Sequence, residues 1–209
     1  MRTTSSSRPD RRFSGRLDRA FYARPAIAVA PDLIGATLVR RWRGRVYRAR
    51  LVEIEAYLGP RDLAAHASKG LTGRTQVLFG PAGRAYVYFI YGLHEMLNIV
   101  TGNTGDAESV LVRAAEPLDG WIADLSGPGK LTRALHISRA QNALDVTGDA
   151  LHLLAAPRPG PRIVRTARIG VDYAQQWKDL PLRFLDADSA AVSRKWRDGG
   201  DSQLQVPRM

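Results

Sequence analysis

The chain contains 209 residues with a mass of 23.0 kDa, and 44% of its residues are hydrophobic. This composition supports one domain with a sizeable core and excludes a chain that is disordered throughout. The absence of cysteine excludes disulfides, thiolate metal sites and cysteine nucleophiles. No apolar run reaches the roughly 18 residues that cross a bilayer, so no membrane partner is expected.

The formal net charge of +11 lies almost entirely in the first 50 residues, which contain 13 arginines against three aspartates. This asymmetry favours a polyanionic partner, most simply nucleic acid, although a solubilising tail would have the same composition. No adequate apolar segment follows the arginines, so an export signal is not predicted. We therefore expect a cytoplasmic, nucleoid-associated protein.

The composition divides the chain into three parts. Residues 1–24 are rich in arginine and serine and are expected to form a basic, flexible arm, with a short helix around Phe13, Leu17 and Phe21. Residues 25–192 are expected to fold as one globular domain. Residues 193–209 are predicted to be a charged C-terminal tail.

The hydrophobic pattern predicts more strand than helix, and therefore a mixed α/β (α+β) fold around an antiparallel sheet. A helix is expected to end at Gly35 and to lead into a strand. Residues 45–57 alternate with period two, as a half-buried strand does, and a polar loop follows to about residue 79. The other predicted elements are strands over 85–91, 96–101 and 109–115, a helix over 130–137, and strands over 151–154 and 162–169.

Common phosphate-loop, dinucleotide and zinc-protease motifs are absent, and the four histidines are dispersed, so no metal site is predicted. Glu55 lies near a strand end, from which a carboxylate can reach into a cleft and act as a general base. A solvent-facing strand carboxylate would show the same pattern, and Glu53 lies on the same face of the predicted strand. Arg113 lies in an apolar strand, so we expect it to pair with a carboxylate, and a guanidinium beside Glu55 would keep that group ionised.

Four blocks in the chain carry a resemblance to a known family. They are LVEIEAYLGPRDLAAH, GPAGRAYVYFIYGLHEMLNIVT, VLVRAAEPLDG and GPGKLTRAL. In this order they resemble the alkyladenine (3-methyladenine) DNA glycosylase family over roughly residues 25–184. The resemblance implies a single compact domain with a curved antiparallel sheet and a protruding, DNA-inserting β-hairpin.

The resemblance also implies the chemistry of the site. Glu55 would activate the attacking water and Arg113 would support it. Tyr57, His66 and Tyr88 would surround a base flipped out of the duplex, and their π faces suit a cationic alkylated purine. The backbone of His66 would help to read the edge of the base.

Further residues would contact the DNA. Asn98 would border the base pocket and disfavour the exocyclic amine of guanine. Tyr91 would fill the gap left in the duplex, with Leu93 as a second contact. Gly129 and Lys130 are either a helix-entry turn or a phosphate contact. Two interpretations, phosphate contacts or a solvated face, are open for Arg40, Arg41, Arg43, Arg45, Arg48 and Arg50.

Two departures from the family pattern lie in the loop beside the predicted pocket. The family often has an Arg-Asn pair followed by Met-Phe where this chain has Arg74, Thr75 and then residues 76–79. The usual Asp-Pro-Ala segment has Leu63 at its centre here. Both departures bear on substrate range.

The sequence therefore predicts a monofunctional, monomeric DNA repair glycosylase. It would act without a cofactor on double-stranded DNA containing damaged purines and leave an abasic site. A non-catalytic nucleic-acid-binding module on the same fold is the alternative, although binding alone requires neither Glu55 nor Arg113. A metal-dependent nuclease is less well supported, because no compact set of metal ligands is present.

Overall fold

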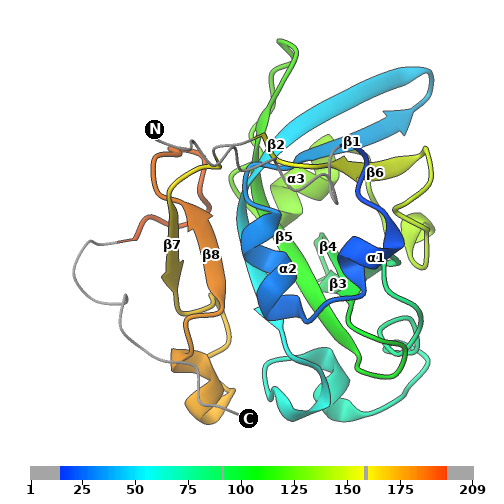
Figure 1. Ribbon diagram of the computed structural model, residues 1–209, viewed down its shortest axis with the longest axis vertical. Coiled ribbons are helices and arrows are strands. Elements are labelled where there is room, and N and C mark those ends of the chain that lie inside the picture. The colour runs from blue at the N-terminus through cyan, green and yellow to red at the C-terminus, as the bar shows by residue number, and fades with distance from the viewer. Residues whose placement is uncertain (1–14, 91, 158–159, 197–209) are drawn as a thin grey trace, which may run out of the picture.

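The computed structural model describes residues 15–90, 92–157 and 160–196, which form one α+β domain around a curled antiparallel sheet (Figure 1). Within these residues the sheet has eight strands. Six of them are arranged in the order β3-β4-β5-β2-β1-β6; β8 pairs with β2, and β7 pairs with β8. The strands are β1 (Thr37–Trp42), β2 (Arg45–Tyr57), β3 (Ala85–Ile90), β4 (His94–Thr101), β5 (Glu108–Pro117), β6 (Leu151–Leu154), β7 (Ile163–Thr166) and β8 (Arg183–Asp186). The predicted fold class and the antiparallel sheet are confirmed.

The helices are short and few among the described residues. They are α1 (Arg19–Tyr22), α2 (Ala26–Asp32) and α3 (Pro128–Ala134), with 3-10 turns at η2 (Gly59–Arg61), η3 (His66–Lys69), η4 (Arg139–Gln141) and η5 (Gln175–Asp179). Pro128 at the first helical position lets α3 begin two residues before the predicted start. In the part of the chain that the structure describes, no helix combines the length and apolar character needed to span a bilayer.

Strand β2 is the centre of the sheet because it changes neighbours along its length. Its first half pairs with β1, whereas Glu53, Ile54 and Glu55 pair with β8, and β5 lies along its other edge. The pairing with β5 is irregular on both sides of Glu53, as at a β-bulge. A bulge bends a strand, and here it accompanies the change of partner from β1 to β8.

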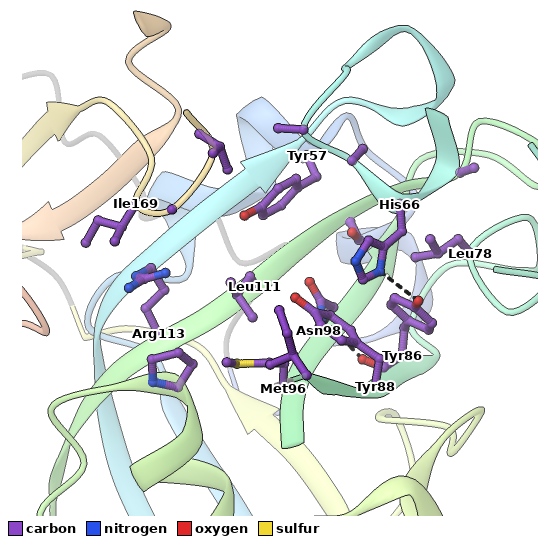
Figure 2. A pocket seen from close by; sticks show the side chains of 18 of the residues that line it. Tyr57, His66, Leu78, Tyr86, Tyr88, Met96, Asn98, Leu111, Arg113 and Ile169 are labelled. Atoms are coloured by element: carbon purple, nitrogen blue, oxygen red, sulfur yellow. Dashed lines mark hydrogen bonds between the residues drawn. The ribbon is translucent and has the colours of Figure 1, made fainter. Parts of the chain in front are cut away.

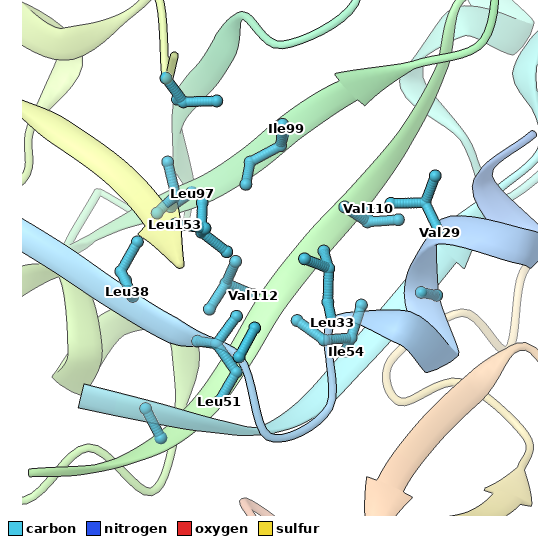
Figure 3. Close-up of a cluster of buried hydrophobic side chains, with 14 of the residues drawn as sticks. Val29, Leu33, Leu38, Leu51, Ile54, Leu97, Ile99, Val110, Val112 and Leu153 are labelled. Carbon is cyan, nitrogen blue, oxygen red and sulfur yellow. The ribbon is translucent and has the colours of Figure 1, made fainter. Parts of the chain in front are cut away.

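The two faces of the sheet have different contents. Helix α2 packs on one face, where Val29 and Leu33 meet apolar side chains of β2 and β5 (Figure 3). This face holds the main core, which includes Leu38, Leu51, Ile54, Leu97, Ile99, Val110, Val112 and Leu153. Because strand side chains alternate between faces, Glu55 on β2 faces the opposite side from Ile54.

Two glycines bring loops close to that opposite face. Gly59 has φ of +78°, and a Cβ there would lie 2.3 Å from the carbonyl oxygen of Asp106. The chain can therefore turn sharply after β2 only with glycine at this position. At Gly129 a Cβ would lie 2.8 Å from Nδ1 of His94, so the start of α3 rests directly against the start of β4, next to the turn of the β3–β4 hairpin.

Residues 15–24 belong to the domain, which corrects the expectation that the whole of residues 1–24 is flexible. The side chains of Leu17, Phe21 and Tyr22 are at most 2% exposed and join the main core. The amide of Leu17 donates to the carbonyl of Leu153 at 2.9 Å. Composition misled here because the arginines that separate these apolar residues dominate the segment. Phe13 lies outside the described residues.

The beginning of the predicted C-terminal tail is also packed on the body. Ser193 donates to Glu53 through its amide and its hydroxyl, and Trp196 packs beside the cluster around Val52 and Leu185. The described part of this segment therefore belongs to the structure around β2 and β8.

We predict that deleting residues 1–24 lowers the free energy of unfolding by at least about 5 kcal/mol. Three buried side chains are lost, and each contributes roughly 1.5–3 kcal/mol by its burial. Urea titration of the truncated protein measures the change. The matched control lacks only residues 1–14 and keeps these contacts, so it should unfold like the full chain. Equal stability of both truncations would show that residues 15–24 add nothing to the core.

Candidate active site

Glu55 lies at the centre of a hydrogen-bonded cluster near the end of β2. Its side chain is fully buried, and its carboxylate accepts three hydrogen bonds. Two reach Oε2, from the Tyr57 hydroxyl at 3.0 Å and from Nη1 of Arg113 at 3.3 Å; the third reaches Oε1, from the Ile169 amide at 2.8 Å. A carboxylate has about four acceptor positions, so this arrangement leaves capacity for one more donor.

Arg113 is held by a second carboxylate as well. Its Nε donates to Oε1 of Glu53 at 2.9 Å and shares the Ser193 hydroxyl with Nη2. Glu53 also accepts from Nε of Arg183 at 2.7 Å. Burial alone would raise the pKa of Glu53, but Arg183 and Arg113 outweigh burial and lower it. The expected pairing of Arg113 with a carboxylate is therefore confirmed, with two carboxylates instead of one.

A pocket of about 350 Å³ opens on the same face of the sheet. The strand register explains part of its lining, because Tyr86, Asn98 and Leu111 lie opposite one another on adjacent strands, and the fully buried Glu55 lies opposite Leu111 on β2. Residues directly opposite in a sheet share a face, as do residues two positions apart. Figure 2 shows side chains from these strands and from two loops turned toward one space; they include Tyr57, His66, Tyr88, Met96, Asn98, Arg113 and Ile169.

Aromatic rings form much of the pocket wall. The His66 and Tyr88 rings are 4.4 Å apart at 66°, and His66 Nδ1 is 2.9 Å from the Tyr86 hydroxyl (Figure 2). Burial is the main cause that raises the pKa of Tyr88 and of Tyr57 above the ordinary value. These phenols therefore stay neutral at physiological pH. The structure brings together the three predicted pocket aromatics Tyr57, His66 and Tyr88.

His66 should remain neutral well into the acid range, because burial, and then the nearby Arg74, lower its pKa from 6.5 to about 4. The unfolded chain binds this proton below about pH 6.5 and the folded chain does not. Stability should therefore be unaffected by His66 above pH 6.5 and fall by up to about 3 kcal/mol as the pH drops toward 4. An NMR titration of the ring in the folded protein should give a midpoint near 4. A midpoint near 6.5 would contradict the buried, neutral imidazole.

The remaining predicted contact residues lie around the pocket or beyond it. Asn98 lines the pocket and is 4% exposed, with Nδ2 directed at the Tyr86 carbonyl at 3.4 Å. Leu93 is 76% exposed in the turn between β3 and β4. Tyr91 lies outside the described residues. Lys130 is half exposed and pairs with Asp124 at 2.8 Å, beside Gly129 at the start of α3.

The loop that departs from the family pattern also borders the pocket. The Thr75 hydroxyl donates to the Gly70 carbonyl at 2.7 Å and closes the loop on itself. Leu78 is buried and lines the pocket, whereas Leu63 is 38% exposed. Arg74, which precedes Thr75 in the sequence, places its guanidinium carbon 5.4 Å from the centre of the Tyr88 ring. Of the two departures, the one that includes Leu78 contributes a side chain to the pocket wall.

The six arginines of β1 and β2 separate into two groups. Arg40 is buried and donates to the carbonyls of Ala150 and His136, while Arg48 and Arg50 form ion pairs with carboxylates. Among the described residues, Arg41, Arg43 and Arg45 are exposed and form no ion pair; they lie at the tip of the β1–β2 hairpin. This second group is therefore available to contact an anionic partner.

Sequence reasoning missed several groups that hold the site. They are the Ile169 amide, Ser193, and the buried ion pair between Asp62 and Arg168. The first is a backbone group and carries no residue signature. Arg168 and Ile169 were assigned to a strand over 162–169, but β7 ends at Thr166 and the chain then enters the site. No group of three or more His, Asp or Glu side chains suited to a metal ion occurs within the described ranges.

Comparison with known proteins identifies the family of the chain. The methylpurine-DNA glycosylase family matches residues 20–190, which contain every residue of the cluster except those of the C-terminal segment. The chain belongs to this family. Membership supports a role as a DNA glycosylase in DNA repair, and it confirms the resemblance drawn from the four sequence blocks.

Several relatives match most of the length of this chain. Proteins from Myxococcus xanthus (strain DK1622) and Anaeromyxobacter sp. (strain Fw109-5) are each 49% identical to it, over 181 and 186 residues. The matches cover 85% and 87% of this chain and 93% and 96% of the relatives. A protein from Alkaliphilus oremlandii is 42% identical over 201 residues, which cover 86% of this chain and all of the relative. All three are named "Putative 3-methyladenine DNA glycosylase".

Proposed function

We propose that the protein removes alkylated purines of the 3-methyladenine type from duplex DNA by hydrolysis of the N-glycosidic bond. The observation that carries this proposal is the position of Glu55, a buried carboxylate oriented by Tyr57, Arg113 and Ile169 directly beside an aromatic pocket. The pocket volume of about 350 Å³ is at the small end of ligand sites, which suits a single base.

In the proposed reaction Glu55 takes a proton from a water molecule as the water oxygen bonds to C1′ of the sugar. The C1′–N bond breaks, and its electron pair leaves with the purine. An alkylated purine is cationic, so it departs as a neutral molecule without prior protonation. The Glu55 carboxylate also stabilises positive charge that develops on the sugar. Arg113 supports this role because its fixed positive charge favours the ionised carboxylate.

The rings of Tyr57, His66 and Tyr88 would hold the flipped base by stacking. A cation binds an electron-rich ring more strongly than a neutral base does, which favours the damaged purine. A neutral His66 adds no positive charge to this wall. Asn98, at the pocket edge, would then exclude the exocyclic amine of guanine.

The β3–β4 turn would enter the minor groove, with Tyr91 as the wedge and the exposed Leu93 beside it. Lys130 and the exposed Arg41, Arg43 and Arg45 would contact phosphates. We also propose that the enzyme acts as a monomer.

The four lysines bear on how the abasic site is left. They are Lys69, Lys130, Lys178 and Lys195. None lines the pocket, and a strand-cleaving glycosylase needs an amine that forms a Schiff base with the sugar. We therefore expect the DNA strand to stay intact after base removal.

The test uses methylated duplex DNA with EDTA throughout. The proposal predicts strand breaks only after alkali treatment and no protein–DNA adduct after borohydride. Breaks that form before alkali and disappear with EDTA would indicate a metal-dependent nuclease. DNA that is bound but never becomes alkali-sensitive would indicate a non-catalytic binding module. A borohydride-trapped adduct would indicate an amine nucleophile.

A further inference from the structure

A buried ion pair lies behind the pocket and is not part of the chemistry described above. The guanidinium of Arg168 forms two hydrogen bonds with the carboxylate of Asp62, and the Nη2–Oδ1 bond measures 2.8 Å. Both side chains are completely buried. Desolvation would lower the pKa of Arg168, but Asp62 more than offsets it and raises the pKa.

This pair joins three segments that are distant in the sequence. Arg168 also donates to the Ala56 carbonyl near the end of β2, at 3.0 Å, and to the Trp177 carbonyl, at 3.3 Å. Asp62 accepts hydrogen bonds from the amides of Leu58 and Ala64, each at 3.0 Å. The pair therefore ties the end of β2, the loop after it and the loop after β7 to one another.

Each segment carries a group of the site. The guanidinium carbon of Arg168 lies 4.7 Å from the centre of the Tyr57 ring, and the next residue, Ile169, donates its amide to Glu55. On the other side, the Asp62 carbonyl accepts from the Ala65 amide at 2.8 Å, immediately before His66. The ion pair thus borders Tyr57, the Ile169 amide and the His66 loop.

We propose that Asp62 and Arg168 are positioning residues that set the place of the Tyr57 ring and of the Ile169 amide relative to Glu55. This inference rests on the proposed glycosylase function. Fold stability alone does not require the pair, because a well-packed apolar pair often replaces a buried ion pair without loss of stability. The guanidinium instead provides directional bonds in one plane, on which an aromatic ring can stack. A displacement of about 1 Å in such a site can reduce the rate about 100-fold.

The test replaces both partners in the full chain, with Asp62→Leu and Arg168→Met, so that neither charge is left alone in the interior. We expect a folded protein that binds a duplex containing a tetrahydrofuran abasic-site analogue within threefold of wild type. Its single-turnover rate of base release at saturating enzyme should fall about 100-fold. A role in stability alone would not separate rate from binding in this way.

Two further variants make the test complete. Arg168→Lys keeps the charge but loses the planar fork, so it should fold and release base about 10-fold more slowly than wild type. The control changes the ion pair between Arg50 and Asp186, which lies outside the pocket, to Arg50→Met with Asp186→Leu. The control should keep the wild-type rate.

A wild-type rate in the folded double variant would overturn the positioning role. If the double variant does not fold, a wild-type rate in Arg168→Lys overturns it instead. Failure of the proposed function itself is distinguishable, because wild-type protein would then release no base.

Discussion

Replacement of Glu55 by glutamine should abolish base release while damaged DNA is still bound. The amide has the shape of the carboxylate and its oxygen can accept from the Ile169 amide, so the pocket keeps its form. The amide cannot take a proton from water, however, and it does not stabilise positive charge on the sugar. Loss of such a general base costs about 10²–10⁴-fold in rate, and the loss of charge adds to this.

Single-turnover release of methylated purines at saturating enzyme measures this effect, and gel-shift titration measures DNA binding. The matched control is Glu108→Gln. Glu108 is partly buried, whereas Glu55 is fully buried, and Glu108 accepts a hydrogen bond from the Ala26 amide at 2.6 Å, outside the pocket. The control should retain the wild-type rate. A Glu55→Gln rate within threefold of wild type would remove Glu55 from its proposed role.

Replacement of Arg113 by glutamine should reduce both catalysis and stability. The guanidinium contacts Glu53 and Glu55, whose side chains are both fully buried. Removing one member of a buried ionic cluster typically costs about 3–5 kcal/mol, because charge is left uncompensated in the interior. Glu55 would also lose the cation that favours its ionised form, so we expect the rate of base release to fall at least about 100-fold.

The two effects can be separated with a second variant, Arg183→Gln. Arg183 also pairs with Glu53 and lies opposite Glu55 in the β2–β8 pairing, but no side-chain hydrogen bond or ion pair joins it to Glu55. Urea titration should show a comparable loss of stability in both variants, and only Arg113→Gln should lose the single-turnover rate at saturating enzyme. If both variants release base at equal single-turnover rates, at urea concentrations where both remain folded, then Arg113 serves stability alone.

Parts of the site could be predicted because they follow from strand periodicity. The period-two pattern of residues 45–57 predicted a strand with Glu53 and Glu55 on one face, and both carboxylates meet Arg113 there. The prediction that this strand is half-buried was wrong, because residues 51–56 are buried on both faces. An arginine inside an apolar strand needs polar partners, and a carboxylate was the partner expected for Arg113. The β3–β4 hairpin was predicted because two apolar runs flank a short glycine-containing turn.

Other parts could not be read from local patterns. The change of partner along β2 depends on a bulge near Glu53, and a bulge leaves no fixed signature in residues 45–57. The contacts of Arg168 with Asp62 and of the Ile169 amide with Glu55 join residues more than 100 positions apart. The roles of Tyr91 and Leu93 in DNA and of Asn98 in base selection remain predictions.

We propose above that this chain hydrolyses alkylated purines from DNA with Glu55 as the base. The most direct measurement incubates wild-type protein and Glu55→Gln with methylated duplex DNA in EDTA and identifies the released bases by chromatography. We predict that wild-type protein releases free 3-methyladenine and that the variant releases it at least 100-fold more slowly. The absence of any free methylated purine with wild-type protein, or equal release by both proteins, would contradict the claim.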